Sequence, residues 1–187
     1  QSRISTNSSS ANEICIIRAD GTNWQRLTNN ESCDTHGNFT PDGTKIVFQR
    51  EPESDAQIWI MNVDGSNQQN LTLVHGGPVV EDGCEVKPMI SPDGTKIAFR
   101  TCDEDIWVMN IDGTNPLKIS GNMDNCSKHS WSPDSQWVLF SADANDDDHS
   151  RIYKVRRDGS GLVMLSEEEG DFCENWAAWS PDGQWIS

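Results

Sequence analysis

Cysteine and histidine occur in the chain at a spacing that suits a soft metal ion. Cys33 is followed three residues later by His36, and Cys126 is followed three residues later by His129. Thiolate sulfur and imidazole nitrogen are ligands that zinc and related metals accept. Two further cysteines occupy corresponding places, but a lysine and a tryptophan stand where their histidines would be. The paired spacing of a known zinc motif is missing, so these four residues form only a weak candidate metal site.

The cysteines are also in register with a recurring proline. Cys33, Cys84 and Cys173 each precede such a proline by eight residues, and Cys126 precedes its proline by seven. All four cysteines are therefore expected at the start of the first strand of a repeat unit, and these starts should lie at the same end of the fold. Three interpretations remain open: a small buried residue inherited within a repeat, disulfide bonds, or ligands of a shared metal.

Six cysteines are an even number, which is consistent with an oxidising compartment and disulfide bonds. A hairpin folded about the intervening Pro-Asp pair places Cys84 opposite Cys102, so a disulfide between them would meet the required Cα separation of about 4.4–6.8 Å. Cys15 and Cys173 are a second candidate pair, which would form if the two ends of the chain joined in one sheet.

The chain is strongly acidic, and this limits its partners. Its 187 residues include 14 basic and 30 acidic side chains, a net charge of −16. Such a surface repels phosphate backbones and anionic membranes, and no apolar run approaches the roughly 20 residues that a membrane helix needs. We therefore expect neither a nucleic-acid partner nor membrane insertion, whereas cationic peptides, basic protein patches and divalent cations remain open.

One link is dense enough in carboxylates to suggest calcium. It contains Asp143, Asp146, Asp147 and Asp148, which offer the oxygen ligands that calcium prefers. No Asp-x-Asp-x-Asp-Gly loop accompanies them, and a solvated acidic link explains them equally well. No other cofactor is expected.

The sequence contains no recognisable catalytic motif. It lacks a GxSxG elbow, an HExxH pair and a Walker loop. Its four histidines have no spacing to serine and aspartate that singles out a triad. We therefore expect no catalytic residues and no enzymatic activity from this chain by itself.

Two phrases alternate along the chain and show which elements position these residues. The first, as in "ISPDGTKIAF", joins two strands through a Ser/Thr-Pro-Asp-Gly turn, and the second, as in "IWVMNIDGTN", ends a strand in an Asp-Gly turn. The Asp-Gly pairs are 44, 48 and 46 residues apart, which is the length of a four-stranded propeller blade. The expected turn-forming residues are Pro41, Asp42, Gly43, Pro92, Asp93, Gly94, Pro133, Asp134, Pro181, Asp182, Gly183, Asp20, Gly21, Asp64, Gly65, Asp112, Gly113, Asp158 and Gly159.

Apolar residues alternate in the strand that follows each Pro-Asp turn. Residues such as Ile97 and Phe99 are therefore expected to point to the same side of their sheet. No apolar pattern with a period of 3.6 residues occurs, so no helix is expected.

These phrases resemble the TolB-type, WD-like propeller repeats. The marks are "WSPDG" followed by an apolar strand, then "IWVMNIDGTN" and a closing "LT", and they cover about residues 13–187. The resemblance implies an all-β propeller whose four-stranded antiparallel blades surround a central channel, with the entering strand innermost. It also implies a periplasmic or extracellular, cell-surface setting. Residues 1–12 are interpreted as a flexible polar lead-in.

The chain holds three complete units and two complementary halves, or about four blade equivalents. The first Asp-Gly phrase, at Asp20, has no Pro-Asp phrase before it, and the last Pro-Asp phrase, at Pro181, has no Asp-Gly phrase after it. The halves would close a four-bladed ring if they paired, or two chains would share them in a homodimer. A third alternative is that the chain is a piece of a longer propeller.

We expect a non-enzymatic binding or scaffolding module that presents an acidic face and the channel mouth to a protein or peptide partner. The lack of a catalytic motif and the large negative charge favour this hypothesis. The alternative, implied by the resemblance, is the propeller portion of a larger enzyme, either a prolyl oligopeptidase-like hydrolase or an oligogalacturonate lyase.

Overall fold

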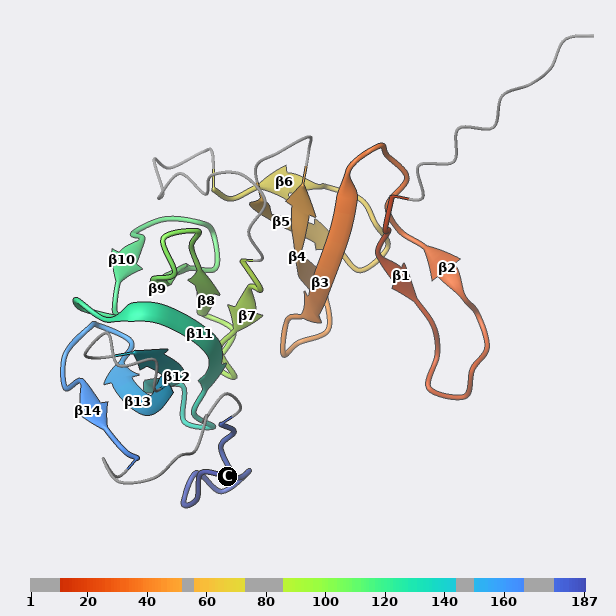
Figure 1. Ribbon diagram of the computed structural model, residues 1–187. Coiled ribbons are helices and arrows are strands. Elements are labelled where there is room, and N and C mark those ends of the chain that lie inside the picture. The colour runs from red at the N-terminus through yellow and green to blue at the C-terminus, as the bar shows by residue number, and fades with distance from the viewer. Residues whose placement is uncertain (1–10, 52–55, 73–85, 144–149, 167–176) are drawn as a thin grey trace, which may run out of the picture.

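The fold is all-β and is built from repeated antiparallel sheets (Figure 1). The computed structural model describes residues 11–51, 56–72, 86–143, 150–166 and 177–187. Within these ranges, three four-stranded sheets follow one another along the chain, in the orders β3-β4-β5-β6, β7-β8-β9-β10 and β11-β12-β13-β14, and a two-stranded sheet β1-β2 precedes them. The strands are β1 Cys15–Ile16, β2 Gln25–Arg26, β3 Cys33–Phe39, β4 Lys45–Glu51, β5 Gln57–Asn62, β6 Gln69–Asn70, β7 Met89–Ile90, β8 Lys96–Arg100, β9 Ile106–Asn110, β10 Leu117–Lys118, β11 Asp124–Trp131, β12 Trp137–Asp143, β13 Ser150–Arg156 and β14 Val163–Met164.

The first two strands of each four-stranded sheet are joined by the Ser/Thr-Pro-Asp turn, with glycine next in the first two sheets and Ser135 in the third. Between β3 and β4, the amide of Gly43 donates to the carbonyl of Thr40 at 2.8 Å, and Oδ1 of Asp42 accepts from the Thr44 amide at 3.0 Å. Asp42 also accepts from the Thr40 hydroxyl, which itself accepts from the Lys45 amide at 3.0 Å. Gly43 has a φ of 70°, a conformation that glycine adopts without a steric penalty.

The last two strands of each sheet are joined by the Asp-Gly turn. In every copy, Oδ1 of the aspartate accepts from the amide and hydroxyl two residues later. The acceptor and donor residues of the four turns are Asp20 with Thr22, Asp64 with Ser66, Asp112 with Thr114, and Asp158 with Ser160.

The core lies between successive sheets, and it arises from the alternation of side chains along the second strands. In β8, Ile97 and Phe99 pack into a cluster with Val47 of the first full sheet, whereas Ala98 packs into a cluster with Phe140 of the third. These residues are fully buried. Each sheet therefore buries apolar residues on both faces, as stacked propeller blades do.

The first strands of the three full sheets lie next to one another, since β7 contacts both β3 and β11. Nδ2 of Asn38 in β3 donates to the carbonyl of Pro88 at 2.9 Å. One sheet further along, Nε1 of Trp131 in β11 donates to the carbonyl of Met89 at 2.9 Å. These bonds tie the inner edges of the sheets together, which is the arrangement that surrounds a propeller channel.

The Pro-Asp turns of successive sheets also touch one another. A Cβ added to Gly94 would lie 3.4 Å from Cδ of Pro41, and one added to Gly183 would lie 3.6 Å from Cδ of Pro133. Between the second and third four-stranded sheets, the residue at this position of the turn is Ser135 instead of glycine. Ser135 has a φ of 62°, and its hydroxyl accepts from the Asp93 amide at 2.9 Å. This departure from the repeat therefore adds a hydrogen bond between sheets.

The two half-units are not joined in one sheet within the described residues. β1 and β2 form a sheet of their own, and the last Pro-Asp hairpin contributes an isolated bridge between Trp179 and Ile186. A groove of about 420 Å³ runs beside β1 and β3 and is lined by Cys15, Ile16 and Phe39 among others. The closed four-bladed ring is therefore not formed by the described residues.

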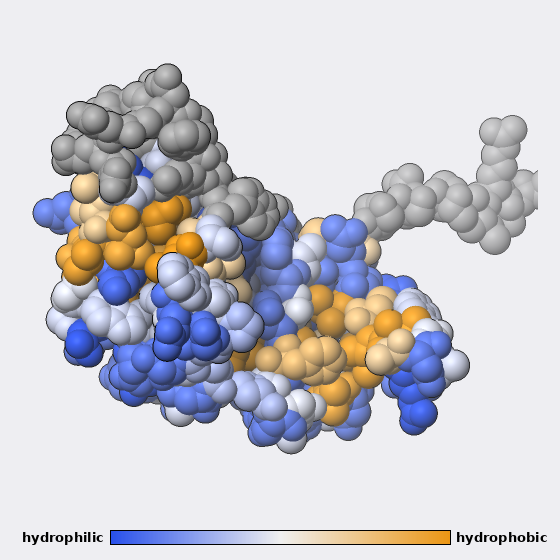
Figure 2. Space-filling view, turned by 90° about the horizontal axis from the view of Figure 1, so that it is seen from below, coloured by the Kyte–Doolittle hydropathy of each residue, from blue (hydrophilic) through white to orange (hydrophobic). Residues whose placement is uncertain are grey.

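Apolar side chains reach the surface in several places, as Figure 2 shows for one face. Among the described residues, the large apolar side chains that are exposed are those of Ile17, Trp24, Phe39, Leu117, Val163, Met164, Leu165 and Trp185.

Truncating a side chain between two sheets should destabilise the whole domain. Phe99→Ala removes a fully buried ring, and we expect the free energy of unfolding to fall by about 3–5 kcal/mol in urea titrations. Phe39→Ala is the matched control because Phe39 is 55% exposed, and its cost should stay below about 1 kcal/mol. Equal losses in the two variants would contradict a core located between the sheets.

Candidate functional site

A cavity of about 470 Å³ lies where the inner edges of the three full sheets meet. Each sheet contributes from its first strand or from the residues just before it. The cavity is lined by His36, Asn38, Lys87, Pro88, Met89, Lys128, His129, Ser130 and Ala177. Cavities of this size accommodate small ligands.

The backbone bends at the same repeat position in all three inner segments. His36, Lys87 and Lys128 each stand five residues before their turn proline, and their φ angles are 52°, 42° and 42°. Pairing in the two longer inner strands shifts register here, between Thr35 and Asn38 and between Ser127 and Ser130. Such bulges re-aim side chains and are common beside binding sites. The bends place three nitrogen-bearing side chains around the cavity.

His129 and Ser130, which line this cavity, each have a buried polar atom without a partner in the part of the chain that the structure describes. The His129 side chain is 7% exposed, and neither its Nε2 nor Oγ of Ser130 has a hydrogen-bond partner among the described residues. Burial lowers the pKa of His129 to about 4, against a smaller opposing effect of the Ala98 and Lys87 backbone. The imidazole is therefore neutral at pH 7.

Of the four cysteines in register with the turn proline, the structure describes Cys33 and Cys126, and Cys126 is a poor metal ligand. Burial raises the pKa of the Cys126 thiol to about 12, so its metal-binding thiolate form is disfavoured. Sγ of Cys33 instead accepts from Nδ2 of Asn12 at 3.4 Å, and Nδ1 of His36 lies 3.0 Å from the Thr35 hydroxyl. Within the ranges that the structure describes, no three histidine, cysteine, aspartate or glutamate side chains are grouped to hold a metal ion.

The acidic link proposed for calcium is described only at its first residue. Oδ2 of Asp143 accepts from Nδ2 of Asn125 at 2.8 Å. Asp146, Asp147 and Asp148 lie outside the described residues, so that hypothesis stays a prediction.

The structure assigns the cysteines as follows. Cys102 is disulfide-bonded, and its predicted partner, Cys84, lies outside the described residues. Cys15 carries a free, exposed thiol, so the predicted bond between Cys15 and Cys173 is not formed. The physical reason is that β1 and the C-terminal hairpin belong to different sheets, whereas that bond required the two ends to share one.

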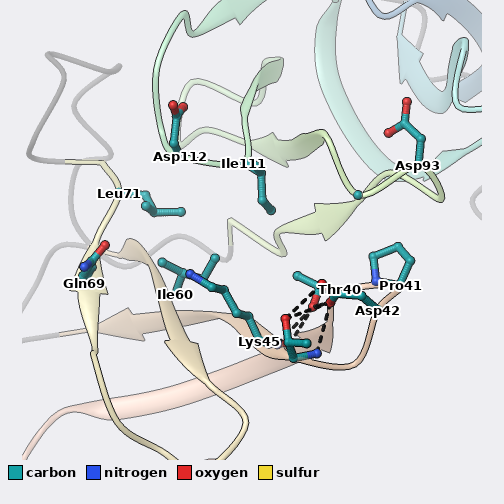
Figure 3. A pocket seen from close by; sticks show the side chains of 12 residues that line it. Thr40, Pro41, Asp42, Lys45, Ile60, Gln69, Leu71, Asp93, Ile111 and Asp112 are labelled. Carbon is teal, nitrogen blue, oxygen red and sulfur yellow. Dashed lines mark hydrogen bonds between the residues drawn. The ribbon is translucent and has the colours of Figure 1, made fainter.

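A second hollow, of about 460 Å³, lies on the face that carries the turns, between the first two full sheets (Figure 3). Apolar side chains of Ile60, Leu71 and Ile111 line it together with three aspartates, Asp42, Asp93 and Asp112, and the cationic Lys45. We call it the turn-face pocket.

Two aspartates of this pocket, Asp42 and Asp93, are held in their charged form by the turns that they organise. Hydrogen bonds from the hydroxyl of Thr40 and from Thr44 lower the pKa of Asp42. For Asp93, desolvation opposes ionisation, but hydrogen bonds from Ser91, Thr95 and Arg157 together outweigh it and lower the pKa to about 2. These two turns thus fix two negative charges beside the turn-face pocket.

Arg157 makes one of these bonds across two sheets. It belongs to the Arg-Arg pair that stands where the first two full sheets have Asn-Val and Asn-Ile. Its Nη1 lies 3.0 Å from Oδ2 of Asp93. A second departure from the repeat therefore also ties neighbouring turns together.

Residue type and spacing single out His36 and His129 in the sequence, but not the cavity that they share. The signal for the cavity is the position five residues before the turn proline, which holds His36, Lys87 and Lys128. The unpaired state of Ser130 has no sequence signal, because it depends on which atoms surround the hydroxyl.

Three comparisons define the class of protein. Repeated four-stranded sheets packed face to face around adjoining inner strands are those of a β-propeller, and a family model described as the TolB beta propeller domain matches residues 3–181. The chain therefore belongs to the TolB beta propeller domain family.

Known relatives agree with this assignment. The Tol-Pal system protein TolB of Bordetella pertussis (strain Tohama I) is 38% identical over 56 residues, which are 29% of this chain and 13% of that protein. TolB from Acinetobacter baumannii has a TM-score of 0.67 at 17% identity, covering 92% of this chain and 41% of that one. An oligogalacturonate lyase in complex with manganese has a TM-score of 0.70 at 14% identity, covering 94% and 52%.

Both structural likenesses show a shared fold alone. The chain spans 13% of the Bordetella protein and about half or less of these two solved structures. Within the described part of the chain, no helix has the length and hydropathy needed to cross a bilayer.

Acid should destabilise the protein partly through Asp93. Its folded-state pKa of about 2 lies below the ordinary 3.8, so the carboxylate stabilises the fold above pH 4, and this contribution is lost as the pH falls from about 4 to about 2. Asp93→Asn keeps an oxygen acceptor for the turn but does not titrate. Urea unfolding at the two ends of this interval should show a smaller loss of stability for the variant than for the wild type. Equal losses would contradict the role of Asp93.

Proposed function

We propose that the chain is a binding module whose turn face takes a protein or peptide partner with basic side chains. Support comes from the turn-face pocket, where Asp42, Asp93 and Asp112 surround an apolar lining. Lysine or arginine side chains of a partner would meet the carboxylates, and an apolar side chain between them would cover Ile60 or Leu71. The net charge of −16 would also speed the encounter with such a partner.

A periplasmic or cell-surface setting is part of this proposal. The disulfide at Cys102 supports an oxidising compartment. The partial likeness to the Bordetella TolB protein points the same way.

The second candidate is the propeller portion of a larger enzyme, which the fold of the oligogalacturonate lyase favours. An assay of this chain with oligogalacturonate and added manganese separates the two. The binding proposal predicts no cleavage, and unsaturated products dependent on the chain would favour the enzyme.

The turn-face pocket should bind a basic, partly apolar peptide in a salt-dependent manner. The probe is a short peptide that alternates lysine and leucine, and fluorescence anisotropy of a labelled copy gives its dissociation constant. The triple variant Asp42→Asn, Asp93→Asn and Asp112→Asn keeps the turn acceptors and removes three charges. We expect this variant to bind the peptide about tenfold or more weakly than the wild type does. Raising the salt concentration from about 50 to 500 mM should also weaken binding of the peptide to the wild type.

A matched control removes three charges elsewhere on the same kind of turn. Asp20→Asn, Asp134→Asn and Asp158→Asn change net charge equally but do not line the pocket. This control should weaken binding by less than about threefold. Equal effects of the two triple variants would show attraction by overall charge alone and would overturn the assignment of the pocket.

A further inference from the structure

A half-unit flanks the row of three full sheets on each side. One is the sheet β1-β2, and the other is the last Pro-Asp hairpin, residues 178–187. We propose that the last Pro-Asp hairpin of one copy pairs with β1 of a second copy, so that the two half-units complete one four-stranded sheet. This contact is separate from the turn-face pocket, and neither proposal depends on the other.

The first observation is the open edge of β1. Among the described residues, β1 pairs with β2 alone, whereas the corresponding strands β5, β9 and β13 each lie between two neighbours. An open edge presents backbone groups that pair readily with a strand of another chain. The last Pro-Asp hairpin is the half of a unit that the sheet β1-β2 lacks. It is already folded, because Ala178 and Ser187 exchange backbone hydrogen bonds of 3.1 and 3.2 Å.

The second observation is an apolar repeat position that is buried in the full sheets and exposed in the first half-unit. It lies three residues before the aspartate of the Asp-Gly turn, where Ile17 is 57% exposed. The corresponding side chains of the three full sheets are at most 2% exposed, and they are Met61, Met109 and Val155. Opposite this position, each full sheet has the residue five places after its turn proline: Ile46, Ile97 and Val138. The last Pro-Asp hairpin has Ile186 at that place, so pairing it with Ile17 would cover the exposed side chain.

The third observation is a pair of repeat positions whose residue types vary together. In each full sheet, the residue four places after the turn proline lies opposite the residue two places before the aspartate of the Asp-Gly turn. The pairs are Lys45 with Asn62, Lys96 with Asn110, and Trp137 with Arg156. Nζ of Lys96 donates to Oδ1 of Asn110 at 2.6 Å. In the third sheet, the guanidinium carbon of Arg156 lies 4.6 Å from the ring centroid of Trp137.

The two half-units carry the members of one such pair on separate pieces. The last Pro-Asp hairpin has Trp185 at the first position, and the first half-unit has Arg18 at the second. Both side chains are exposed in the single chain, Trp185 by 74%. In the joined sheet, Arg18 of one copy would stack on Trp185 of the other, as Arg156 stacks on Trp137. A cation held over an aromatic face is stabilising, and more so when water is excluded.

The places of the two half-units in the fold make a second copy the occupant. Figure 1 shows β1 and the C-terminus apart, with the three full sheets in order between them. Ile14, beside β1, packs with Ile46 of the first full sheet, and the turn of the last Pro-Asp hairpin meets Pro133 of the third. Joining the halves within one chain would require these sheets to repack into a tighter ring. Two copies related by a twofold rotation instead join at both ends, and they would form a ring of about eight blades, which is within the range of propellers.

Sedimentation velocity of the whole chain over a concentration series tests the proposal, and we expect a monomer–dimer equilibrium. Trp185→Lys places a lysine opposite Arg18, and it should weaken dimerisation about tenfold or more. Adding Arg18→Asn should recover about threefold or more of that loss, because the two positions then carry the lysine–asparagine pair of the first two full sheets. Both side chains are exposed in the single chain, so neither change should lower its Tm. Leu117→Lys is the control, since Leu117 is 44% exposed in the middle sheet, and it should dimerise as the wild type does.

Disulfide trapping identifies the strands that meet. Cys15→Ser first removes the exposed thiol of β1, and Ile17→Cys and Ile186→Cys are then introduced into separate chains. Opposite residues of antiparallel strands have Cα atoms about 4.5–5.5 Å apart, which permits a disulfide. Oxidising the mixture should give a covalent dimer, and peptide mapping should find the bond between positions 17 and 186. Leu117→Cys in place of Ile186→Cys is the control and should give no such dimer.

Three results would overturn the proposal. The first is a monomer at all protein concentrations up to about 0.5 mM, and the second is a loss in Trp185→Lys that Arg18→Asn does not reduce. The third is a monomeric chain carrying both Ile17→Cys and Ile186→Cys that forms the disulfide within itself, which would show closure inside one chain. The turn-face triple variant should dimerise as the wild type does, so failure of one proposal is distinguishable from failure of the other.

Discussion

The structure depends on the burial of two apolar faces on every four-stranded sheet. Ile97 and Phe99 face the preceding sheet and Ala98 faces the following one, and all three are completely buried. A single sheet of this kind would expose one face or both to water, at roughly 25 cal/mol per Å² of apolar surface. No repeat unit is therefore expected to be stable alone, and stability comes from the interfaces between neighbours.

The same constraint explains why the turns are so regular. Successive Pro-Asp turns contact one another only if their hairpins end at the same level of neighbouring sheets. Gly94 and Pro41 show such a contact. Where the repeat is broken, the replacement residues Ser135 and Arg157 both bond to Asp93 of the adjacent turn. The aspartates that build the turns also keep their charge there, so one residue type provides local structure and the acidity of the turn face.

Much of the fold could be predicted from the sequence, because turn chemistry and strand alternation are local. The period of about 46 residues located the three full sheets, and the pattern in β8 correctly gave the direction of Ile97 and Phe99. The fate of the two half-units was not predictable, since pairing between distant segments depends on the closure of the whole arrangement. For the same reason the Cys15 pairing was wrong.

The candidate cavity was predicted only in fragments. His36 and His129 stood out by residue type, whereas the positive φ angle at Lys87 and at Lys128 is a backbone feature without a glycine to mark it. The unpaired atoms of His129 and Ser130 depend on how the neighbouring segments pack against β11. Spacing along one strand carries no information on that arrangement.

A double-mutant cycle across one interface tests most directly whether stacked sheets hold this fold together. Val47 and Ile97 come from neighbouring sheets and share one buried cluster, whereas Ile46 and Val138 belong to different clusters. Urea unfolding of alanine variants should give a coupling free energy of about 0.5 kcal/mol or more for the first pair and additive losses for the second. Additive losses for Val47 and Ile97 would contradict the account.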